Sequence, residues 1–471
     1  MCRISITTKV LSSTQTLVTL NKSATGGMAP RGSSFPGLWK YPSNRDIWAK
    51  SSLSWLEGRR KDDGAHGLWR IHDHLYDFST FVDSHPGGAD WLQLTKGTDI
   101  TEAFEVHHLT SLPRAMLDKY KVRPTSERRN SPYTFLPDGF YNTFKTRVLQ
   151  KFSTSQLKGP SAESKLVTDS LFSAFVVCTL ISAYKSSIDF AMLAGVLLAF
   201  TVCAAHNFVH MRNEWRRNYV NLSMLSAKHF RIYHTLSHHL YPNSVLDLEV
   251  SLLEPWLPWL PRPEKNVLER YVSWLISPIV YTLMFPSEFA RRVISHGPDL
   301  NDLSALLVPA AMGLVSPASL YLWPVMILTA SFVYSLTSIN AGHHHPEVVH
   351  DGDAARKDRD WGLAQVDCVI DRGDLIGVSV STDGAISSSG SWWHFVLVLC
   401  NFGHHTLHHL MPTVDHFRLR QMYPILEQTL ADFGIRYRVD GAIPLVSSQF
   451  QQLARNEPNP LPPEEREKKM M

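Results

Sequence analysis

The sequence has little cysteine, and what it has is widely scattered. No two cysteines have the spacing of a metal-binding pair, and their odd number does not suit a disulfide framework. A small secreted scaffold is therefore excluded, reducing surroundings are favoured, and we expect any bound metal to be held by histidine. The five cysteines are Cys2, Cys178, Cys203, Cys368 and Cys400.

The sequence also lacks a strong excess of either charge. It has 46 Lys and Arg against 43 Asp and Glu, and its basic residues form no stripe. We therefore expect no nucleic-acid partner. The mean hydropathy of −0.12 excludes a polytopic transporter and favours soluble parts joined to a few apolar segments.

Acidic residues are absent from residues 1–34, which contain four basic residues and many Ser and Thr. This composition is typical of a mitochondrial transit peptide. A disordered extension, with Met28 as an alternative start, is the plainer interpretation. We therefore expect residues 1–47 to form a disordered N-terminal extension.

Charge is also missing from two long stretches. Residues 303–342 contain no Asp, Glu, Lys, Arg or His, and residues 170–205 contain only Lys185 and Asp189, both near the middle. A helix of 40 residues is ~60 Å long, about twice the ~30 Å of a bilayer core. Each stretch therefore suits two crossings, with turns near residues 185–189 and at Pro317.

Lysine and arginine flank the outer ends of the first hairpin, which places those ends on the cytosolic side of a membrane. Two buried hairpins in a soluble helical domain are the alternative. A third apolar patch, residues 271–285, contains Pro278 and is expected to be interfacial or re-entrant. Residues 392–402 are too few to span a bilayer.

Histidine is crowded where the apolar legs end, in "HNFVH", "HTLSHH", "NAGHHHPE" and "NFGHHTLHHLMP". A single cluster is explained as readily by a helix face or a solvated loop. Together the clusters exceed what one tetrahedral zinc needs, and imidazole suits iron. We therefore predict a histidine-rich pair of irons that activates oxygen. The clusters contain His206 and His210, then His234, His238 and His239, then His343 to His345, and last His404, His405, His408 and His409.

An N-terminal segment has a different character. The alternation in "LWRIH" and "LYDF" predicts short strands, and "HPGG" predicts a tight turn that presents His85 to a flat cofactor. A helical run then begins at Thr101 and leads to His107 and His108.

The order W-x6-Y-D-x3-F, H-P-G-G and F-x3-H over residues 48–124 resembles the cytochrome b5 domain. This resemblance implies an α+β domain that binds haem b between His85 and His108, with His107 less favoured by the spacing. A haem with two histidine ligands passes electrons, and an NADH-dependent cytochrome b5 reductase is the implied donor. We expect an acidic rim to dock that basic partner, the alternative being an ordinary solvated face. The rim residues are Asp83, Asp90, Asp99, Glu102 and Glu105.

The segments "HNFVH", "HTLSHH" running into "LYPNSVLDLE", and "HHTLHHLMP" resemble the three histidine boxes of the membrane fatty acid desaturase family, and "DWGLAQVD" resembles the segment before the last box. The resemblance covers residues 165–437. It implies an all-α membrane domain of four transmembrane helices under a cytosolic cap, with two non-haem irons that use O₂ on a lipid acyl chain. His405 stands where front-end desaturases usually have Gln, so the position attacked on the chain stays open. The implied ligands are His206, His210, His234, His238, His239, His405, His408 and His409, with His344 at the auxiliary position.

The expected organisation is a haem domain at residues 48–124, a linker at 125–164, a membrane domain at 165–440 and a tail at 441–471. This order also resembles that of the cytochrome b5-related proteins. We predict a multi-pass protein of the endoplasmic reticulum membrane that desaturates an acyl chain on its cytosolic side. The alternatives are an acyl-chain hydroxylase, a haem electron carrier with a catalytically silent second domain, and a soluble metal-binding protein.

Overall fold

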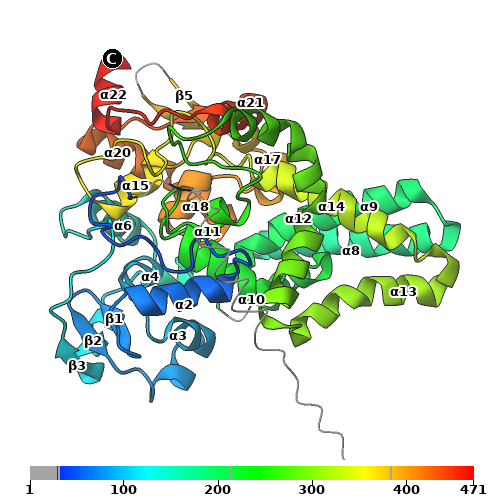
Figure 1. The fold of residues 1–471 in the computed structure, drawn as a ribbon, viewed down its shortest axis with the longest axis horizontal. Coiled ribbons are helices and arrows are strands. Elements are labelled where there is room, and N and C mark those ends of the chain that lie inside the picture. The colour runs from blue at the N-terminus through cyan, green and yellow to red at the C-terminus, as the bar shows by residue number, and fades with distance from the viewer. Residues whose placement is uncertain (1–28, 30–31, 213, 382–383, 471) are drawn as a thin grey trace, which may run out of the picture.

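The computed structural model describes residues 29, 32–212, 214–381 and 384–470, so residues 1–28 with the predicted alternative start lie outside the described part. A small N-terminal domain lies at one end of the molecule (Figure 1). Its antiparallel sheet has the order β1-β2-β3, with Arg70 opposite Leu75 and Leu75 opposite Arg123. The two predicted strands are confirmed as β1 (Trp69–Ile71) and β2 (His74–Tyr76).

Short helices surround this sheet and enclose an aromatic core. Trp69, Phe78 and Phe104 are buried in it together with Ile71 and Leu92. The "HPGG" turn lies between two of the helices, with Gly88 at φ +105°, a backbone conformation that L side chains rarely adopt. The other elements are α2 (Ser52–Asp62), η1 (Val82–Ser84), α3 (Ala89–Thr95), α4 (Thr101–His107), α5 (Leu112–Met116), η2 (Leu117–Tyr120) and β3 (Lys121–Pro124).

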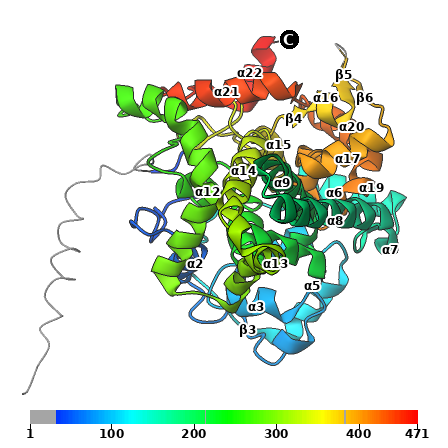
Figure 2. The same ribbon diagram turned by 90° about the vertical axis from the view of Figure 1, so that its right-hand side faces the viewer.

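Two apolar helical hairpins project from the opposite side (Figures 1 and 2). In the first, Ser186 adopts a left-handed conformation at the end of α8, and the side chain of Ser187 caps α9. The second hairpin breaks at residues 316–319, so both turns lie where the sequence predicts them. The helices are α8 (Ala162–Lys185) and α9 (Ile188–Val209), then η6 (Leu300–Leu306), α13 (Leu307–Val315), η7 (Pro317–Ser319) and α14 (Leu322–Ser338).

The outer faces of these helices are apolar. Tyr184 is 78% and Leu314 90% exposed, and Val177, Met192 and Leu307 are also exposed. Within the described residues, two helical segments are long and apolar enough to cross a membrane, Thr154–Lys185 and Ile188–Val209, whereas Leu300–Val315 and Leu322–Ser338 are shorter. Large exposed apolar areas of this kind mark a lipid or protein contact surface.

The third apolar patch is a continuous helix, α12 (Ser273–His296), and not a re-entrant turn. It continues through Pro278 and Pro286, and Ser331 on α14 satisfies the backbone that is opened beside Pro286. The Phe285 N–H donates to Ser331 Oγ at 3.0 Å, and that hydroxyl donates to the Tyr281 carbonyl at 2.7 Å. A serine on a neighbouring helix thus allows α12 to continue through a proline. The sequence around Pro286 gives no sign of this serine.

A mixed cap lies over the inner ends of the hairpins, and residues 392–402 contribute one short helix to it, as their length indicates. The cap includes η3 (Trp215–Ser223), α10 (Ala227–Phe230), η4 (Arg231–His238), α11 (Leu248–Leu252), α15 (Trp361–Asp367), β4 (Asp371–Arg372), α16 (Gly373–Ile376), β5 (Val378–Val380), β6 (Ile386–Ser388), α17 (Trp392–Cys400), α18 (His405–Leu410), α19 (His416–Leu419), η8 (Arg420–Met422), α20 (Tyr423–Phe433) and β7 (Val439–Asp440).

The segments expected to be a linker, a disordered extension and a tail all have packed parts. In residues 125–164, α6 (Phe140–Lys151) buries Phe140, Phe144 and Val148 completely in the main core, and α7 (Thr154–Leu157) follows it. Because they are four residues apart, these three side chains lie on one helix face. The polar composition of the segment as a whole hid this apolar face. In the extension, Phe35 and Leu38 are also buried. The tail forms α21 (Ala442–Ala454) and α22 (Pro463–Met470).

Candidate haem and metal sites

Two histidine rings face each other across a gap in the N-terminal domain. The Nδ1–H of His85 donates to the Gly88 carbonyl at 2.9 Å, and that of His108 donates to the Phe104 carbonyl at 3.0 Å. Because a neutral imidazole has one N–H, each Nε2 keeps a free lone pair. The two ring centroids are 6.2 Å apart.

This gap has the dimensions of a haem site. An imidazole–metal bond is about 2 Å long. Two such bonds, added to the distance from each ring centre to its Nε2, give about the separation observed between the centroids of His85 and His108. Burial lowers the pKa of His108 to about 4, so the ring is in the neutral form that binds a metal. A Cβ at Gly87 would lie 2.7 Å from the His85 ring. A larger residue would therefore displace that ring, and glycine leaves room for it.

His107 does not share this gap. Its Nδ1–H donates to the Ala103 carbonyl at 2.9 Å, and its ring stacks on Trp91 at 6.0 Å and 21°. Of the two residues that the sequence proposed opposite His85, the structure places His108 there.

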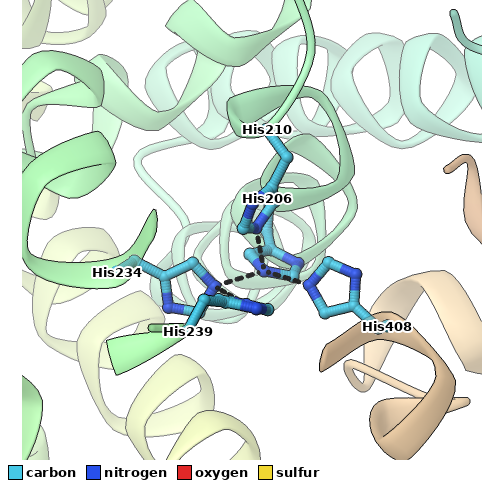
Figure 3. A group of neighbouring side chains, drawn as sticks. All are labelled: His206, His210, His234, His239 and His408. Atoms are coloured by element: carbon cyan, nitrogen blue, oxygen red, sulfur yellow. Dashed lines mark hydrogen bonds between the residues drawn. The ribbon is translucent and has the colours of Figure 1, made fainter. Parts of the chain in front are cut away.

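Five histidines from three distant segments form the first group of candidate metal ligands (Figure 3). The Nε2 of His206 lies 2.6 Å from that of His234, 3.3 Å from that of His210 and 3.2 Å from that of His408. The Nε2 of His239 is 3.0 Å from that of His234. All five side chains are buried.

Four further histidines form the second group. The Nε2 of His343 lies 3.1 Å from that of His238, 2.8 Å from that of His405 and 3.1 Å from that of His409. His344, which the sequence proposed for the auxiliary position, lies outside both groups. Its ring stacks on Trp259 at 3.8 Å, and the neighbouring His343 occupies the predicted position.

The hydrogen bonds of the second group suit a bound cation. Each Nδ1 faces an oxygen that can only accept: a carboxylate of Asp247 for His238, the Cys368 carbonyl for His343 and the Phe402 carbonyl for His405. His409 faces the amide oxygen of Gln365 in the same way. The Nε2 lone pairs of His343, His405 and His409 therefore point to one place, and they repel unless a proton on His238 or a bound cation lies among them. Ligands at right angles around a metal at 2.0–2.1 Å are about 2.9 Å apart, which matches the observed distances.

A wide helical turn brings the three middle histidines to these groups. The η4 segment is a π-helix, and the His239 N–H donates to the His234 carbonyl, five residues back, at 2.9 Å. A π-helix has more residues per turn than an α-helix, so the residues four and five positions after His234 lie on either side of it around the helix axis. His234 and His239 thereby join the first group, and His238 joins the second.

A mostly apolar cavity of about 560 Å³ adjoins the metal ligands. His234, His238, His343 and His405 line one part of it. Its walls come from α11, α12 and α14, and they include Val250, Leu253, Ile279, Val280, Leu283, Met284 and Ile339. Such a cavity holds an apolar ligand against the candidate metal site.

Comparison with protein families agrees with this arrangement. Residues 188–441 match the family described as fatty acid desaturase, and residues 53–126 match the cytochrome b5-like haem/steroid-binding domain. The chain belongs to the fatty acid desaturase family. It is a desaturase-type oxidoreductase chain in which a haem-binding cytochrome b5 domain precedes a helical desaturase domain.

Curated relatives share this order over most of their length. A cytochrome b5-related protein of Drosophila melanogaster is 44% identical over 436 residues, which cover 90% of this chain and 96% of that protein. A probable Delta(5) fatty acid desaturase C of Dictyostelium discoideum is 21% identical over 83% of this chain and 92% of its own length. An acyl-lipid (8-3)-desaturase of Mortierella alpina is 22% identical over 78% of this chain and 89% of its own.

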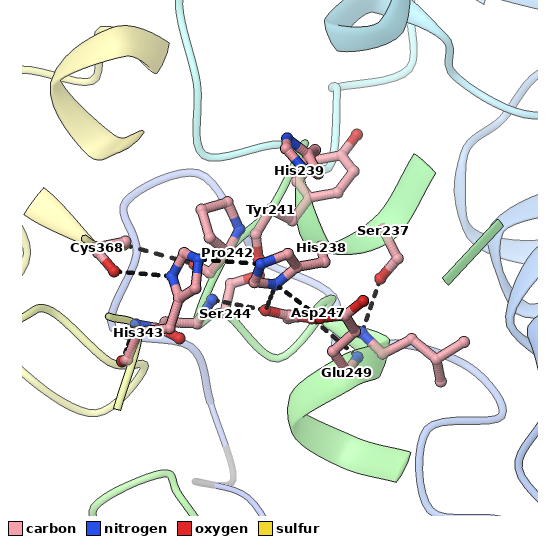
Figure 4. Close-up of polar contacts among 12 residues, drawn as sticks. Ser237, His238, His239, Tyr241, Pro242, Ser244, Asp247, Glu249, His343 and Cys368 are labelled. Atoms are coloured by element: carbon pink, nitrogen blue, oxygen red, sulfur yellow. Dashed lines mark hydrogen bonds and ion pairs between the residues drawn. The ribbon is translucent and has the colours of Figure 1, made fainter. Parts of the chain in front are cut away.

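Two carboxylates lie behind the desaturase histidines, and Figure 4 shows both of them beside His238. Glu249 accepts from the Nδ1–H of His234 at 2.7 Å, and Asp247 accepts from that of His238 at 2.9 Å. Burial opposes the charge on His238, but Glu249 and Asp247 raise its pKa to about 9. Burial holds the pKa of His239 and of His409 well below the usual range. Without a metal the carboxylates favour a proton on His238, and a bound cation would take the place of that proton, whereas His239 and His409 stay neutral.

Asp247→Asn should weaken iron binding by the second group. The amide replaces a charged acceptor that orients His238, and the loss of such a partner costs about 10–100-fold in metal affinity. Iron retained by the purified protein during a chelator titration measures the effect, and haem content should stay the same. Asp432→Asn, at an exposed position on α20, is the matched control. Equal iron retention in both variants would exclude this role for Asp247.

The predicted acidic rim is not a free surface. Asp99, Glu102 and Glu105 are buried; Asp99 accepts from Arg129 at 2.7 Å and Glu102 accepts from the Tyr241 hydroxyl at 2.9 Å. Asp90 is exposed but pairs with Arg231 of the desaturase domain at 3.1 Å. Most of these carboxylates therefore hold the chain's own parts together, and the prediction of an open rim is wrong.

Sequence reasoning chose His344 in place of His343, and it missed the carboxylates behind the ligands and the walls of the cavity. The "LDLE" of the second box carried a signal for Asp247 and Glu249, since buried metal-binding histidines need acceptors at their other nitrogen. No comparable signal distinguishes His343 from His344 or places α12 beside the site.

Proposed function

We propose that the protein desaturates a lipid acyl chain at two irons held by nine histidines, with electrons from its own cytochrome b5 domain. The convergence of Nε2 lone pairs in the two groups is the observation that supports this most directly. When bound, the two irons supply the activation of O₂ and the abstraction of hydrogen from an unactivated carbon. The histidines hold the irons, and Asp247 and Glu249 orient His238 and His234.

The cavity supports an acyl chain as substrate. Its walls offer Val250, Ile279, Val280 and Leu283 to a ligand, and the candidate metal ligands His238 and His343 line the same cavity. Apolar contacts hold a hydrocarbon chain and exclude water from the carbon that reacts. The same machinery also suits hydroxylation, because both reactions begin with hydrogen abstraction.

We further propose that both hairpins cross the membrane of the endoplasmic reticulum, four helices in all, with the metal site and the haem on the cytosolic side. The exposed apolar faces of α8, α9 and α13 support this placement. The haem domain would occupy residues 48–124 and the desaturase domain residues 165–440. An NADH-dependent cytochrome b5 reductase would supply electrons to the haem held by His85 and His108.

Lipid profiling of cells with and without the protein tests this proposal. We expect lipids with one additional double bond only where the intact protein is present, and not with the His408→Ala variant. Hydroxylated lipids in their place would identify a hydroxylase. Unchanged lipids, with haem and iron bound, would contradict enzymatic activity on acyl chains and favour an electron carrier.

Val280→Trp should lower the rate of substrate conversion by about tenfold or more. The indole would fill part of the cavity that Val280 lines, so an acyl chain could no longer reach the ligands. Product formation by the purified protein measures this, and haem and iron content should not change. Leu275→Trp adds the same side chain to α12 at a position 68% exposed and outside the cavity lining. If the two variants are equally active, the cavity is not the substrate site.

A further inference from the structure

The cytochrome b5 domain is docked on the desaturase domain. Trp91, Leu94 and Ala103 of the first pack against Ile232 and Leu236 of the π-helix that carries the ligands of the second box. Polar contacts add to this interface. The Tyr241 hydroxyl donates to Glu102 at 2.9 Å, and Lys145 Nζ donates to the Glu105 carbonyl at 2.7 Å. The haem gap is therefore held at a fixed place relative to the histidine groups.

Helix α4 presents two neighbouring faces at this interface. One face points toward the haem gap, and it carries Phe104 and His108, which are four residues apart. The neighbouring face carries Ala103 and His107, which are also four residues apart. On this face Ala103 packs on the apolar cluster that includes Ile232 of the desaturase domain. Side chains four apart on a helix share one face. The haem ligand His108 and the residue that faces the desaturase domain, His107, are thus neighbours at the end of α4.

His107 has no other evident task. Its ring stacks on Trp91, and that indole also contacts the guanidinium of Arg231, 3.8 Å from the ring centroid. Arg231 begins the π-helix, three residues before His234. The Nε2 of His107 is buried and has no hydrogen-bond partner among the described residues. A buried unpaired polar atom is costly, so a structural role alone explains His107 poorly.

His107 also lies on the side of α4 that meets the helix of the second histidine box. Its ring stacks on Trp91, and Trp91 packs on Ile232 and Leu236 of the π-helix that contains His234 and His238. His107 is therefore adjacent along the chain to the haem ligand His108 and is connected through Trp91 to the helix that carries metal ligands.

We propose that His107 is the bridge through which electrons pass from the haem to the non-haem metal centre within one chain. Each passage moves one electron: the haem iron changes from ferrous to ferric, one non-haem iron changes from ferric to ferrous, and no bond or proton changes at His107. The packed ring shortens the gap that an electron must cross, and Trp91 fixes its orientation. This inference rests on the haem and metal sites of the proposed function, but not on the formation of a double bond.

Flash photoreduction of the haem tests the bridge in the full-length protein, purified in detergent and loaded with haem and ferric iron. A photoexcited deazaflavin reduces the haem, and the decay of the ferrous haem absorbance then reports electron transfer to the metal centre. We expect a decay whose rate is independent of protein concentration. We expect His107→Ala to be about tenfold slower than the wild type. His66→Ala removes an imidazole that pairs with Glu127 and should leave the rate unchanged.

His107→Phe keeps a flat ring against Trp91, and its rate should stay within about threefold of the wild type. It also carries the test if the alanine variant does not fold. Wild-type decay in His107→Ala, or a rate that rises with protein concentration, would overturn the proposal. Equal slowing in His107→Phe and His107→Ala, at equal haem and iron content, would also overturn it. Normal decay without a lipid product would instead remove the proposed desaturase activity and leave the bridge intact.

Discussion

His408→Ala should abolish substrate conversion and remove at least part of the non-haem iron, while the haem spectrum stays that of the wild type. The Nε2 of His408 lies 3.2 Å from that of His206 in the first group, and its side chain is completely buried. Alanine leaves a gap that no other imidazole in the group can fill, so both metal binding and the chemistry that depends on it fail. Elemental analysis, the haem absorbance spectrum and product formation measure the three effects.

His404→Ala is the matched control for this variant. His404 belongs to the same histidine-rich segment, but its Nδ1 contacts the Tyr423 hydroxyl at 2.9 Å, and it is in neither ligand group. We expect the control to keep most of its iron. Full activity and full iron content in His408→Ala would refute the assignment of this histidine as a ligand.

His85→Ala should eliminate the absorbance spectrum of a haem with two histidine ligands and reduce NADH-driven turnover to background. His85 is held by the Gly88 carbonyl on the turn that faces His108, and without it the haem loses one of its two protein ligands. Non-haem iron should remain, because the desaturase histidines do not contact this ring.

A chemical reductant distinguishes a loss of electron supply from a loss of folding. A low-potential dye that reduces the metal centre directly should restore one round of product formation to His85→Ala, but not to His408→Ala. If His85→Ala keeps the wild-type haem spectrum and turns over with NADH, the assignment of His85 is wrong.

Much of the fold could be predicted from local pattern. The alternation in "LWRIH" and "LYDF" predicted β1 and β2, the missing charges predicted both hairpins, and Lys185, Asp189 and Pro317 marked their turns. What failed was decided by distant contacts. The linker prediction missed α6 because Phe140 and Val148 are recognisable as core only when the surface they cover is known. Of the two alternatives for residues 271–285, interfacial or re-entrant, the re-entrant one failed because α12 continues through Pro278 and Pro286, with Ser331 on another helix satisfying the backbone beside Pro286.

The residues of the candidate sites were likewise predictable from local spacing in part, and in part only from distant contacts. Spacing sufficed to propose His85 and His108, which the structure brings face to face, and eight histidines that it gathers into two groups. Spacing could not choose between His343 and His344, because adjacent residues point in different directions and only the Cys368 carbonyl fixes which one turns inward.

The contact between the two domains was also beyond the sequence. Glu102 and Asp90 are ordinary surface residues in composition, and an acidic rim was a reasonable expectation for a cytochrome b5 domain. Their partners Tyr241 and Arg231 lie more than a hundred residues away along the chain. Such partners appear only when the domains are docked, and here they convert a predicted surface for another protein into an internal interface.

Iron content per chain tests the central claim most directly. The purified, fully loaded protein should contain three irons per chain, one extractable as haem b and two non-haem irons in the two histidine groups. Total iron by elemental analysis and haem by its pyridine derivative give the two values independently. A protein that holds one iron per chain, all of it in haem, even after iron is supplied during purification, would contradict the account.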